Sequence, residues 1–551
     1  MKLDKYFDGN KFNIKSYVKY YKMLNDNVSK LQNKNSALLN GEKTNYKKLI
    51  QNKFLHYETK NPRIVLEELS NYFRRSVVWE NAGTMINITP PTNKISLVAA
   101  DYCNKFNPNF AQDESSGYLM TTELLTVKYL SDMVGWDWLK SRGTFTFGGK
   151  GTIMYAIKDA INKCCKDVRN SGVDKNIKII SNDKGHPCHI EVCDWLGLGR
   201  DACLRLPTSE SGQVDLKELE FTLRENLSNG VKIAAIILNG GTTNEVIVDP
   251  IKEVVDMRDK LVVEYGLDYI PHVHIDSVIG WAWLFFKNYD FESNSLNMTK
   301  DDKKKIKSLS EKISQIKYAD SFGADFHKTG FCPYISSCIV FKNGKDLYNL
   351  GGRELVEFDN LNFGTYSPFE YTLELSRSAI GPVSAYVALE TFGVKGFQQL
   401  IYEVFKRGQF IRRFLSKQDK VEVINKETEG FATLFVIHPQ NKNYKYLDYL
   451  SLDDKEVKDF LEYNHKFYLY TLQLLENKQV DFKITFSKSY KPYGAKKSMG
   501  ALKIYQTSPL SKFVDIKKCL LELINAKTQF ENGINLTLKE DSNTPKDFVY
   551  R

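Results

Sequence analysis

The sequence predicts an α/β protein whose largest part is a mainly parallel sheet flanked by helices. Short β-rich runs alternate with helical stretches through the middle of the chain, as in right-handed crossovers between parallel strands. Helical spacing dominates the start, and a long amphipathic stretch followed by β-like runs marks the end. We therefore expect an N-terminal helical arm (1–75), a large domain (76–385) and a small C-terminal α+β domain (386–551).

The arm is predicted from two segments with apolar residues at helical spacing, SYVKYYKMLNDNVSKLQ (16–32) and PRIVLEELSNYFRRSVV (62–78). The first residues lack the apolar stretch of an export signal. No run in the chain approaches 18 apolar residues. We therefore expect neither a secretory leader nor a membrane partner.

The sheet of the large domain is predicted from three β-rich runs, IKIISND (177–183), VKIAAIILNGG (231–241) and HVHIDS (272–277). Each run ends in polar residues or glycine. A Lys- and Ser-rich stretch (288–317) indicates an inserted surface helix. Ligands of parallel sheets bind beyond the carboxyl ends of the strands, so polar residues at these ends are the candidates for function.

The small domain is predicted from a long amphipathic helix that begins near residue 386 and from the β-like runs FATLFVIHP, DFKITFS and MGALKIYQ.

The charge distribution and the cysteine content indicate which kinds of partner and which cellular compartment to expect. The net charge of +10 is spread in short patches beside acidic residues, which is typical of a solvated surface rather than a nucleic-acid site. The nine cysteines include no C-x-x-C pair, so a metal site is not indicated. A reduced, cytoplasmic location is the simplest interpretation.

Two elements of a candidate site come before the strand ending in Asp276. A Gly-rich turn containing Gly148, Gly149 and Gly151 runs into a helix, whose N-terminus favours a phosphate. A plain tight turn would have the same pattern. His186 follows a strand end, where an imidazole can lie flat on an aromatic ligand ring, and His189 is the competing histidine.

Two further elements are a strand-end carboxylate and a lysine among apolar neighbours. Asp276 closes an apolar strand, and a buried carboxylate needs a charged or strongly donating partner to stay ionised. Capping of the next helix is the alternative role. Lys328 lies among small and apolar residues, where desolvation favours the neutral amine that Schiff-base chemistry requires. Together the four elements are the contacts that pyridoxal phosphate needs.

The same segments resemble the group II pyridoxal-phosphate-dependent amino-acid decarboxylases, within the aspartate-aminotransferase fold type (fold type I). The resemblance runs from about residue 80 to 400, with a looser similarity to about 510. It is carried by TMINITPPTN (84–93), TTELLTVKYLSDMVGW (121–136), GTFTFGGKGTIMYA (143–156), HVHIDSVIG (272–280) and ADSFGADFHKTGF (319–331).

The resemblance implies a role for each matched residue. Lys328 would form the Schiff base with the cofactor, Asp276 would pair with its ring nitrogen, and His186 would stack on its ring. The other implied cofactor contacts are Gly149, Lys150 and Gly151 in the phosphate turn, His327 at the phosphate, Thr243 near the phenolic oxygen and Val278 under the ring. Tyr366, on the loop after the lysine that is mobile in the family, would donate a proton to the substrate carbon, and a structural role is the alternative for this tyrosine. A homodimer with active sites at its interface is also implied.

The chain departs from the family pattern in several places. Lys150 and Gly151 stand where small and hydroxyl residues occur, Phe147 is bulky, Phe326 replaces a proline, and Lys503 replaces an arginine.

The predicted reaction is decarboxylation of an L-amino acid to its amine and carbon dioxide. Met85, Asn87, Thr89 and Phe147 are the candidate substrate contacts, and they favour an aromatic or neutral substrate over glutamate. Two alternatives remain open. One is the pyridoxal-phosphate lyases that cleave phosphorylated long-chain amino alcohols, which SFGADFHKTGFCPY (321–334) and SRSAIGPVSAYVAL (376–389) also resemble. The other is a non-catalytic scaffold with the same fold.

Overall fold

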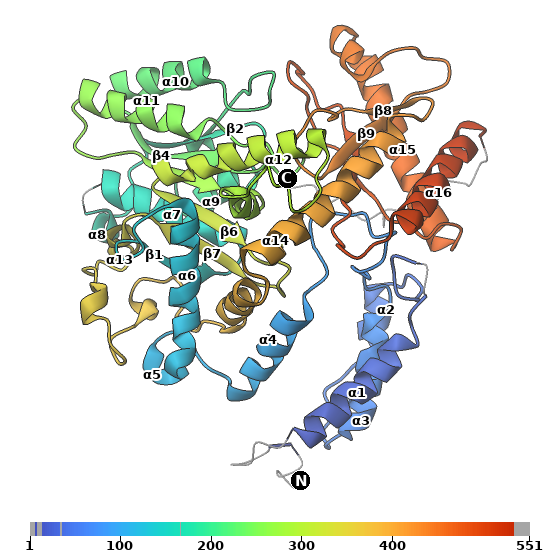
Figure 1. The fold of residues 1–551 in the computed structure, drawn as a ribbon, viewed down its shortest axis with the longest axis horizontal. Coiled ribbons are helices and arrows are strands. Elements are labelled where there is room, and N and C mark those ends of the chain that lie inside the picture. The colour runs from blue at the N-terminus through green and yellow to red at the C-terminus, as the bar shows by residue number, and fades with distance from the viewer. Residues whose placement is uncertain (1–5, 8–13, 34–35, 166, 534–551) are drawn as a thin grey trace.

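The computed structural model describes the chain except for residues 1–5, 8–13, 34–35, 166 and 534–551. A large body holds the main sheet, a smaller domain lies beside it, and a helical arm projects away from both (Figure 1). The arm contains α1 (Lys15–Ser29), α2 (Tyr46–Ile50) and α3 (Pro62–Ser70). The predicted helical character of this region is therefore confirmed for its described residues.

The main sheet has seven strands in the order β1-β7-β6-β5-β4-β2-β3. Only β7 runs antiparallel to its neighbours, so the predicted mainly parallel sheet is confirmed. The strands are β1 (Arg142–Thr146), β2 (Ile177–Asn182), β3 (Cys203–Leu206), β4 (Lys232–Asn239), β5 (His272–Asp276), β6 (Ser321–Asp325) and β7 (Ser337–Phe341).

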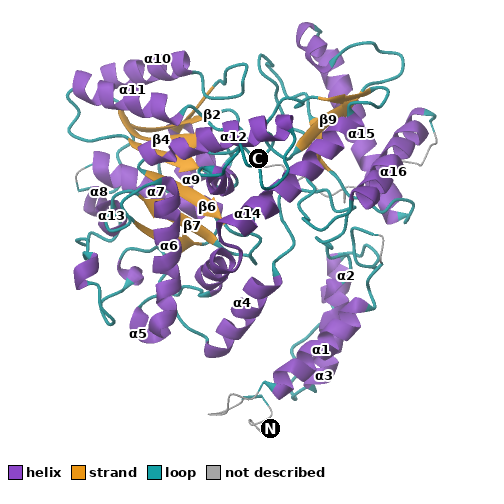
Figure 2. Ribbon diagram, in the orientation of Figure 1, coloured by secondary structure: helices purple, strands orange, loops and turns teal. Residues whose placement is uncertain are grey.

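Helices cover both faces of this sheet (Figure 2). Successive side chains of a strand point to opposite faces, and β5 follows this rule. Val273 and Ile275 join the large core that includes residues of α10 and α11, whereas His272 and Asp276 contact side chains of α7 and α9. The helices of this body are α4 (Lys94–Phe106), α5 (Asp113–Ser116), α6 (Thr121–Val134), α7 (Gly149–Cys164), α8 (Val168–Ser171), α9 (Cys188–Trp195), α10 (Leu216–Ser228), α11 (Ile251–Glu264), α12 (Lys300–Ile313) and α13 (Gly344–Asn349).

The smaller domain packs helices against a four-stranded antiparallel sheet in the order β10-β11-β9-β8. Its elements are β8 (Val421–Val423), β9 (Thr433–Ile437), α15 (Asp454–Glu476), β10 (Thr485–Ser487), β11 (Ala501–Ile504) and α16 (Phe513–Glu531). The predicted α+β character of the C-terminal region is confirmed.

One helix joins the two domains. α14 (Ile380–Leu415) packs on α4 and α6 near its start and on α16, β8 and β9 further along, with a kink at Gly393. The expected boundary at 385/386 therefore lies inside a helix, because the chain enters the small domain without an intervening loop. Within the described residues no helix is long and apolar enough to cross a membrane.

Candidate active site

The candidate residues gather where the parallel strands end. β5 ends at Asp276 and β6 at Asp325, while His186 follows β2 and Thr243 follows β4. Parallel neighbouring strands bring these ends to one edge of the sheet. The charge of Lys328 acts on both Asp276 and His186, so the three groups lie within electrostatic reach of one another.

Lys328 follows β6 and is only 19% exposed at its side chain. Its Nζ lies 2.7 Å from Asp325 Oδ2, and Ser337 Oγ donates to Asp325 Oδ1 at 2.5 Å. The ion pair stabilises the ammonium that burial disfavours. Sequence reasoning expected desolvation alone to act on this lysine and missed Asp325.

His327 points back toward the same carboxylate. Its Nε2 lies 3.4 Å from Asp325 Oδ2, and the backbone N–H of Ser336 donates to Nδ1 at 3.2 Å. Burial lowers the pKa of His327, which keeps the ring neutral. The ring of Tyr334 lies 4.1 Å from the His327 ring between centroids. Tyr334 was missed because nothing in the motif distinguishes it from a loop tyrosine.

His186 sits just before α9 with its ring mostly enclosed. The backbone N–H of Cys188 donates to His186 Nδ1 at 3.2 Å. Burial lowers the pKa of His186 to about 3, an effect that the carboxylate of Asp276 only partly offsets. The imidazole is therefore uncharged at neutral pH, which suits a ring that is expected to stack on another ring.

Asp276 is buried at the end of β5, and its two oxygens differ. Oδ2 accepts a hydrogen bond from His189 Nε2 at 3.1 Å. Oδ1 is buried and has no hydrogen-bond partner among the described residues. Burial raises the pKa of Asp276, but the opposing contributions, of which the hydrogen bond from His189 is the largest and which include the ammonium of Lys328, outweigh it, so the net pKa is lowered. An ionised carboxylate with one bare oxygen fits the protonated ring nitrogen of pyridoxal phosphate.

The Gly-rich turn makes room beside these groups. Gly148 has φ +127°, and Gly149 opens α7. A Cβ at Gly149 would lie 3.0 Å from Asp325 Oδ2 and 3.2 Å from Val278 Cγ1. The space that the missing side chain leaves, together with the free N–H groups of the helix start, suits a phosphate.

The side chain of Lys150 turns away from this space. Its Nζ forms an ion pair with Glu191 and lies 4.5 Å from the centroid of the Trp195 ring. In this arrangement the side chain of Lys150 is occupied on α9, so the phosphate turn has backbone groups to offer there. Gly151, one residue on, lies against Thr146 and the Phe147 ring.

The loop after β4 carries Thr243, which is half-buried. Its neighbour Asn244 accepts a hydrogen bond from Lys503 Nζ at 3.0 Å. Lys503 is buried in β11, and burial lowers its pKa to about 8. No carboxylate of the described chain forms an ion pair with this lysine. The loop is thus bonded to the small domain.

The segment 84–93 also reaches the site. Ile88 and Pro90 line a small cavity together with Lys328 and Phe331. Met85 is buried against the small domain, where Tyr505 N donates to its carbonyl at 3.0 Å.

The polar side chains of this segment differ in their contacts. Thr89 Oγ1 lies 3.1 Å from the hydroxyl of Tyr334. Asn87 Oδ1 is buried without a hydrogen-bond partner in the described part of the chain. Phe147, at the phosphate turn, is 37% exposed.

The structure does not bring Tyr366 to the strand ends. Its side chain is buried with Cys103, Phe110 and Val383, and burial raises its pKa well above the ordinary value. A fully packed tyrosine with so high a pKa is poorly suited to donate protons from a mobile loop. The loop sequence could not show this, because it does not reveal that the segment folds back onto α4.

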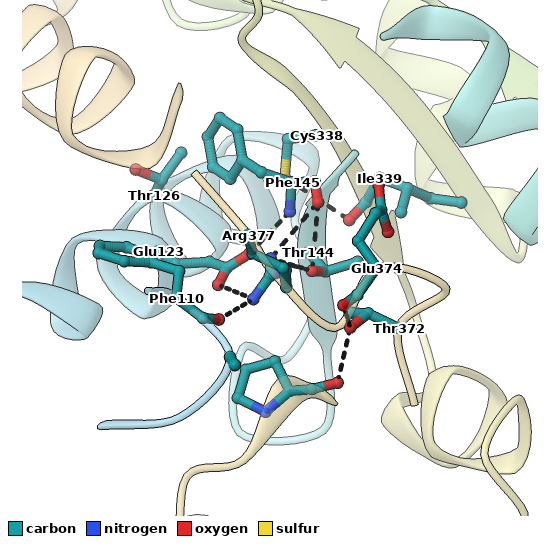
Figure 3. A network of polar contacts seen from close by, with 12 residues as sticks. Phe110, Glu123, Thr126, Thr144, Phe145, Cys338, Ile339, Thr372, Glu374 and Arg377 are labelled. Carbon is teal, nitrogen blue, oxygen red and sulfur yellow. Dashed lines mark hydrogen bonds and ion pairs between the residues drawn. The ribbon is translucent and has the colours of Figure 1, made fainter. Parts of the chain in front are cut away.

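Tyr366 lies within electrostatic reach of a buried ion pair that sequence reasoning did not single out. Figure 3 shows this pair, which is formed by Glu123 and Arg377. Arg377 donates through Nη2 to Glu123 Oε1 at 2.5 Å and to Thr144 Oγ1 at 2.6 Å. Its Nη1 donates to the carbonyl of Phe110 at 2.7 Å. The cluster joins β1, α6 and the segment before α14.

One other buried cluster gathers groups of the metal-binding type. Asp159 Oδ2 lies 3.2 Å from His272 Nδ1, and Asp346 stands close by. Lys163 Nζ lies 2.8 Å from Asp159 and 2.7 Å from Asp346, so an ammonium already bridges these two carboxylates. This cluster lies at the opposite end of β5 from Asp276.

Comparison with known proteins identifies the family to which the sequence is similar. Residues 65–436 match the family described as the pyridoxal-dependent decarboxylase conserved domain. The chain is 23% identical over 387 residues to an aromatic-L-amino-acid decarboxylase of Bacillus atrophaeus, covering 68% of this chain and 71% of that protein. It is 23% identical over 435 residues to an L-tyrosine decarboxylase of Enterococcus faecium, covering 64% and 67%.

Solved structures share the fold. Mouse CSAD in its apo form superposes with a TM-score of 0.74 at 16% identity, covering 93% of this chain and 99% of that one. Oryza sativa TDC with PLP and tryptamine superposes with a TM-score of 0.75 at 14% identity, covering 96% and 100%. The predicted fold type is thereby confirmed.

Proposed function

Because the chain belongs to the pyridoxal-dependent decarboxylase family, we propose that it decarboxylates an L-amino acid on pyridoxal phosphate bound covalently to Lys328. The chain is a carboxy-lyase, and pyridoxal phosphate is its cofactor. The identity of the anchoring lysine and of the amino acid are the proposed parts. When bound, pyridoxal phosphate supplies an electron sink for the pair that is released as carbon dioxide leaves.

The observation that carries the proposal is the bare Oδ1 of Asp276. This buried acceptor lies at the same sheet edge as Lys328 and the glycine cradle at Gly149. A buried acceptor without a partner costs free energy, so such an atom in a folded protein usually meets water, an ion or a ligand. A protonated ring nitrogen would satisfy it.

The residues of the chain divide the remaining work. Asp276 holds a proton on the ring nitrogen because its own pKa is lowered. His186, uncharged, offers a flat face to the ring. Asp325 holds Lys328 by its ion pair until the lysine is engaged. The N-terminus of α7 accepts the phosphate charge.

We further propose that the substrate is an aromatic or neutral L-amino acid. Phe147 offers apolar surface, and Asn87 and Thr89 offer small polar groups, whereas Met85, expected to contact the substrate, is buried against the small domain. An acidic amino acid is the second candidate, because Lys503 is a buried cation next to the Thr243 loop.

A panel of L-amino acids tests the reaction and the substrate together. We expect carbon dioxide and the matching amine from at least one aromatic or neutral amino acid, with glutamate and aspartate much slower. Release of carbon dioxide from glutamate or aspartate alone would favour an acidic substrate, the second candidate. Aldehyde from a phosphorylated amino alcohol, with no carbon dioxide from any amino acid, would instead favour the retro-aldol alternative.

The anchoring lysine is tested by borohydride reduction of the loaded protein. The peptide containing Lys328 should gain the mass of the reduced cofactor, and Lys328→Ala should lose both this mass and the decarboxylation. Lys345→Ala, a change of an exposed lysine, is the matched control and should behave as wild type. Label on any other lysine would contradict the assignment, and a protein that binds no cofactor would favour the scaffold.

We also propose a homodimer and a cytoplasmic location. Large apolar side chains remain exposed on the arm and on α4, among them Tyr17, Tyr21, Ile64, Val98, Tyr102 and Phe106. Exposed apolar surface of this extent is typical of an interface. All nine cysteines are free thiols, which is consistent with a reducing compartment. Sedimentation of the purified chain at twice the monomer mass is the expected result for the dimer.

A further inference from the structure

The carboxylate of Asp276, which is proposed to pair with the ring nitrogen, accepts a hydrogen bond from a buried histidine. His189 is fully buried in the first turn of α9 and uses both of its ring nitrogens. Its Nε2 lies 3.1 Å from Asp276 Oδ2, and its Nδ1 lies 2.7 Å from Ser181 Oγ. Ser181 belongs to β2, so the line of three residues joins β2, α9 and β5.

The chemistry of the groups fixes the proton between them. A carboxylate only accepts hydrogen bonds, so the contact to Asp276 requires the proton on Nε2 of His189. Ser181 then has its hydroxyl available for Nδ1, which holds the ring in this orientation. With Oδ2 engaged, the carboxylate has only Oδ1 left to offer a ligand, and Oδ1 is the bare oxygen.

We infer that His189, held by Ser181, is a positioning residue that orients Asp276 and keeps it ionised, so that Oδ1 is presented to the ring nitrogen of the cofactor. The inference rests on the proposed cofactor site and adds a residue that does not itself touch the cofactor. Sequence reasoning treated His189 only as a competitor of His186, and the structure separates the two roles.

The groups around Asp276 show why His189 matters. The carboxylate lies on the strand of His274 and meets groups of α9, of the segment before it and of the loop after β6. Burial lowers the pKa of His274 to about 3, so that ring is uncharged. Burial raises the pKa of the Cys188 thiol well above its usual value, so it is uncharged too. The titratable and charged groups that act on Asp276 are His186, Cys188, His189, His274 and Lys328.

Without His189, the effect of burial on the pKa of Asp276 is opposed by fewer groups. Burial raises the pKa of this carboxyl, and the largest opposing contribution is the hydrogen bond from His189. Loss of that bond therefore moves the pKa of Asp276 upward. The bound cofactor then loses its charged partner at a higher pH as the solution is acidified.

The experiment measures cofactor retention against pH, with no substrate present. His189→Leu is compared with wild type by equilibrium dialysis and by the visible absorbance of the bound cofactor. We expect an acid limb displaced to higher pH by as much as the pKa of Asp276 rises, so that at a fixed pH on that limb retention is about tenfold weaker per unit of displacement. His189→Gln, whose amide can donate to Asp276 in place of Nε2, should return the limb toward wild type.

A matched control lies in the small domain. His438 is also buried and also contacts a carboxylate, with Nε2 at 2.9 Å from Glu422 Oε2. His438→Leu removes the same kind of bond far from the strand ends. It should leave the acid limb where wild type has it.

The outcomes separate the inference from the proposed function. A wild-type protein that binds no cofactor contradicts the proposed function. If wild type binds the cofactor but the acid limb of the retention profile is the same for His189→Leu, His438→Leu and wild type, the inference is overturned and the proposed function is not. If His189→Leu does not fold, Ser181→Ala takes its place, since it removes one hydroxyl. A smaller displacement in the same direction supports the inference, and no displacement overturns it.

Discussion

Each ionic side chain of the site is held by one buried neighbour. Asp276 is bonded to His189, and Lys328 is paired with Asp325. Asp276, which is proposed to pair with the cofactor, could be singled out in the sequence, because a polar residue that closes an apolar strand is conspicuous in the sequence pattern. The contacts of these residues could not be predicted. Asp325 also closes an apolar strand, but its ion pair with Lys328, three residues on, is visible only in the folded chain, as is the contact between His189 on α9 and Asp276 on β5.

A buried lysine gives the first prediction at this scale. Burial lowers the pKa of Lys503 to about 8 from an ordinary value near 10.5. Between these pH values the unfolded chain binds the proton and the folded chain does not, so this group makes stability rise with pH. Lys503→Met should be more stable than wild type by up to about 3 kcal/mol at pH 7, with a gap that narrows above pH 8.

Urea unfolding of both proteins at several pH values between 7 and 9.5 measures this gap. Lys512→Met, a change of an exposed lysine, is the control and should show no pH-dependent difference from wild type. A gap for Lys503→Met that stays constant over this range would contradict the expected titration.

At the scale of elements, the buried Arg377–Glu123 pair joins β1, α6 and the segment that leads into α14. Both side chains are almost completely buried, so each charge depends on the other. Helices and strands of this region could be predicted from periodicity, but the pair could not, because its partners lie 254 residues apart. Tyr366 belongs to the same packing, which explains why a residue expected on a mobile loop is found in a core.

The second prediction concerns this pair. Arg377→Met leaves Glu123 as an uncompensated buried charge and should cost about 3–5 kcal/mol in the free energy of unfolding. Arg353→Met is the matched control, because Arg353 is 58% exposed in its ion pair with Glu370. Thermal or urea unfolding should show no measurable change for that variant. Equal losses for the two variants would show that burial does not govern the cost.

At the scale of the whole molecule, side chains of the small domain contact the loops that follow strands of the large domain. Lys184 Nζ lies 3.3 Å from Glu245 Oε2 and 4.3 Å from the centroid of the Tyr490 ring, and Tyr490 donates to Glu245 Oε1 at 2.6 Å. The two-domain arrangement could be predicted from the change in pattern along the chain. The boundary at 385/386 stays a prediction that falls within α14, since continuous helical periodicity conceals the point where one core gives way to the next.

The third prediction tests the contact between Tyr490 and Glu245. Tyr490→Phe removes the hydroxyl that holds Glu245, two residues after Thr243, and should increase hydrogen exchange in residues 240–249. Cofactor affinity should weaken by about a few fold, less than the roughly tenfold or more that one hydrogen bond to a charged group is worth, because the hydroxyl acts on the loop and not on the cofactor. Tyr493→Phe is the control in the same segment, because Tyr493 is exposed. Unchanged exchange in Tyr490→Phe would show that the loop holds its shape unaided.

The position of Asp276 on β5 makes the chain intolerant of insertions and deletions there. His272 and Asp276 lie four residues apart on the same face of the strand, one in the Asp159 cluster and one in the site. Adding or removing a single residue between them would rotate one of the two to the opposite face. Length changes in natural variants of this enzyme should therefore avoid residues 272–276 and collect in segments such as 288–299, where the chain runs outside the sheet.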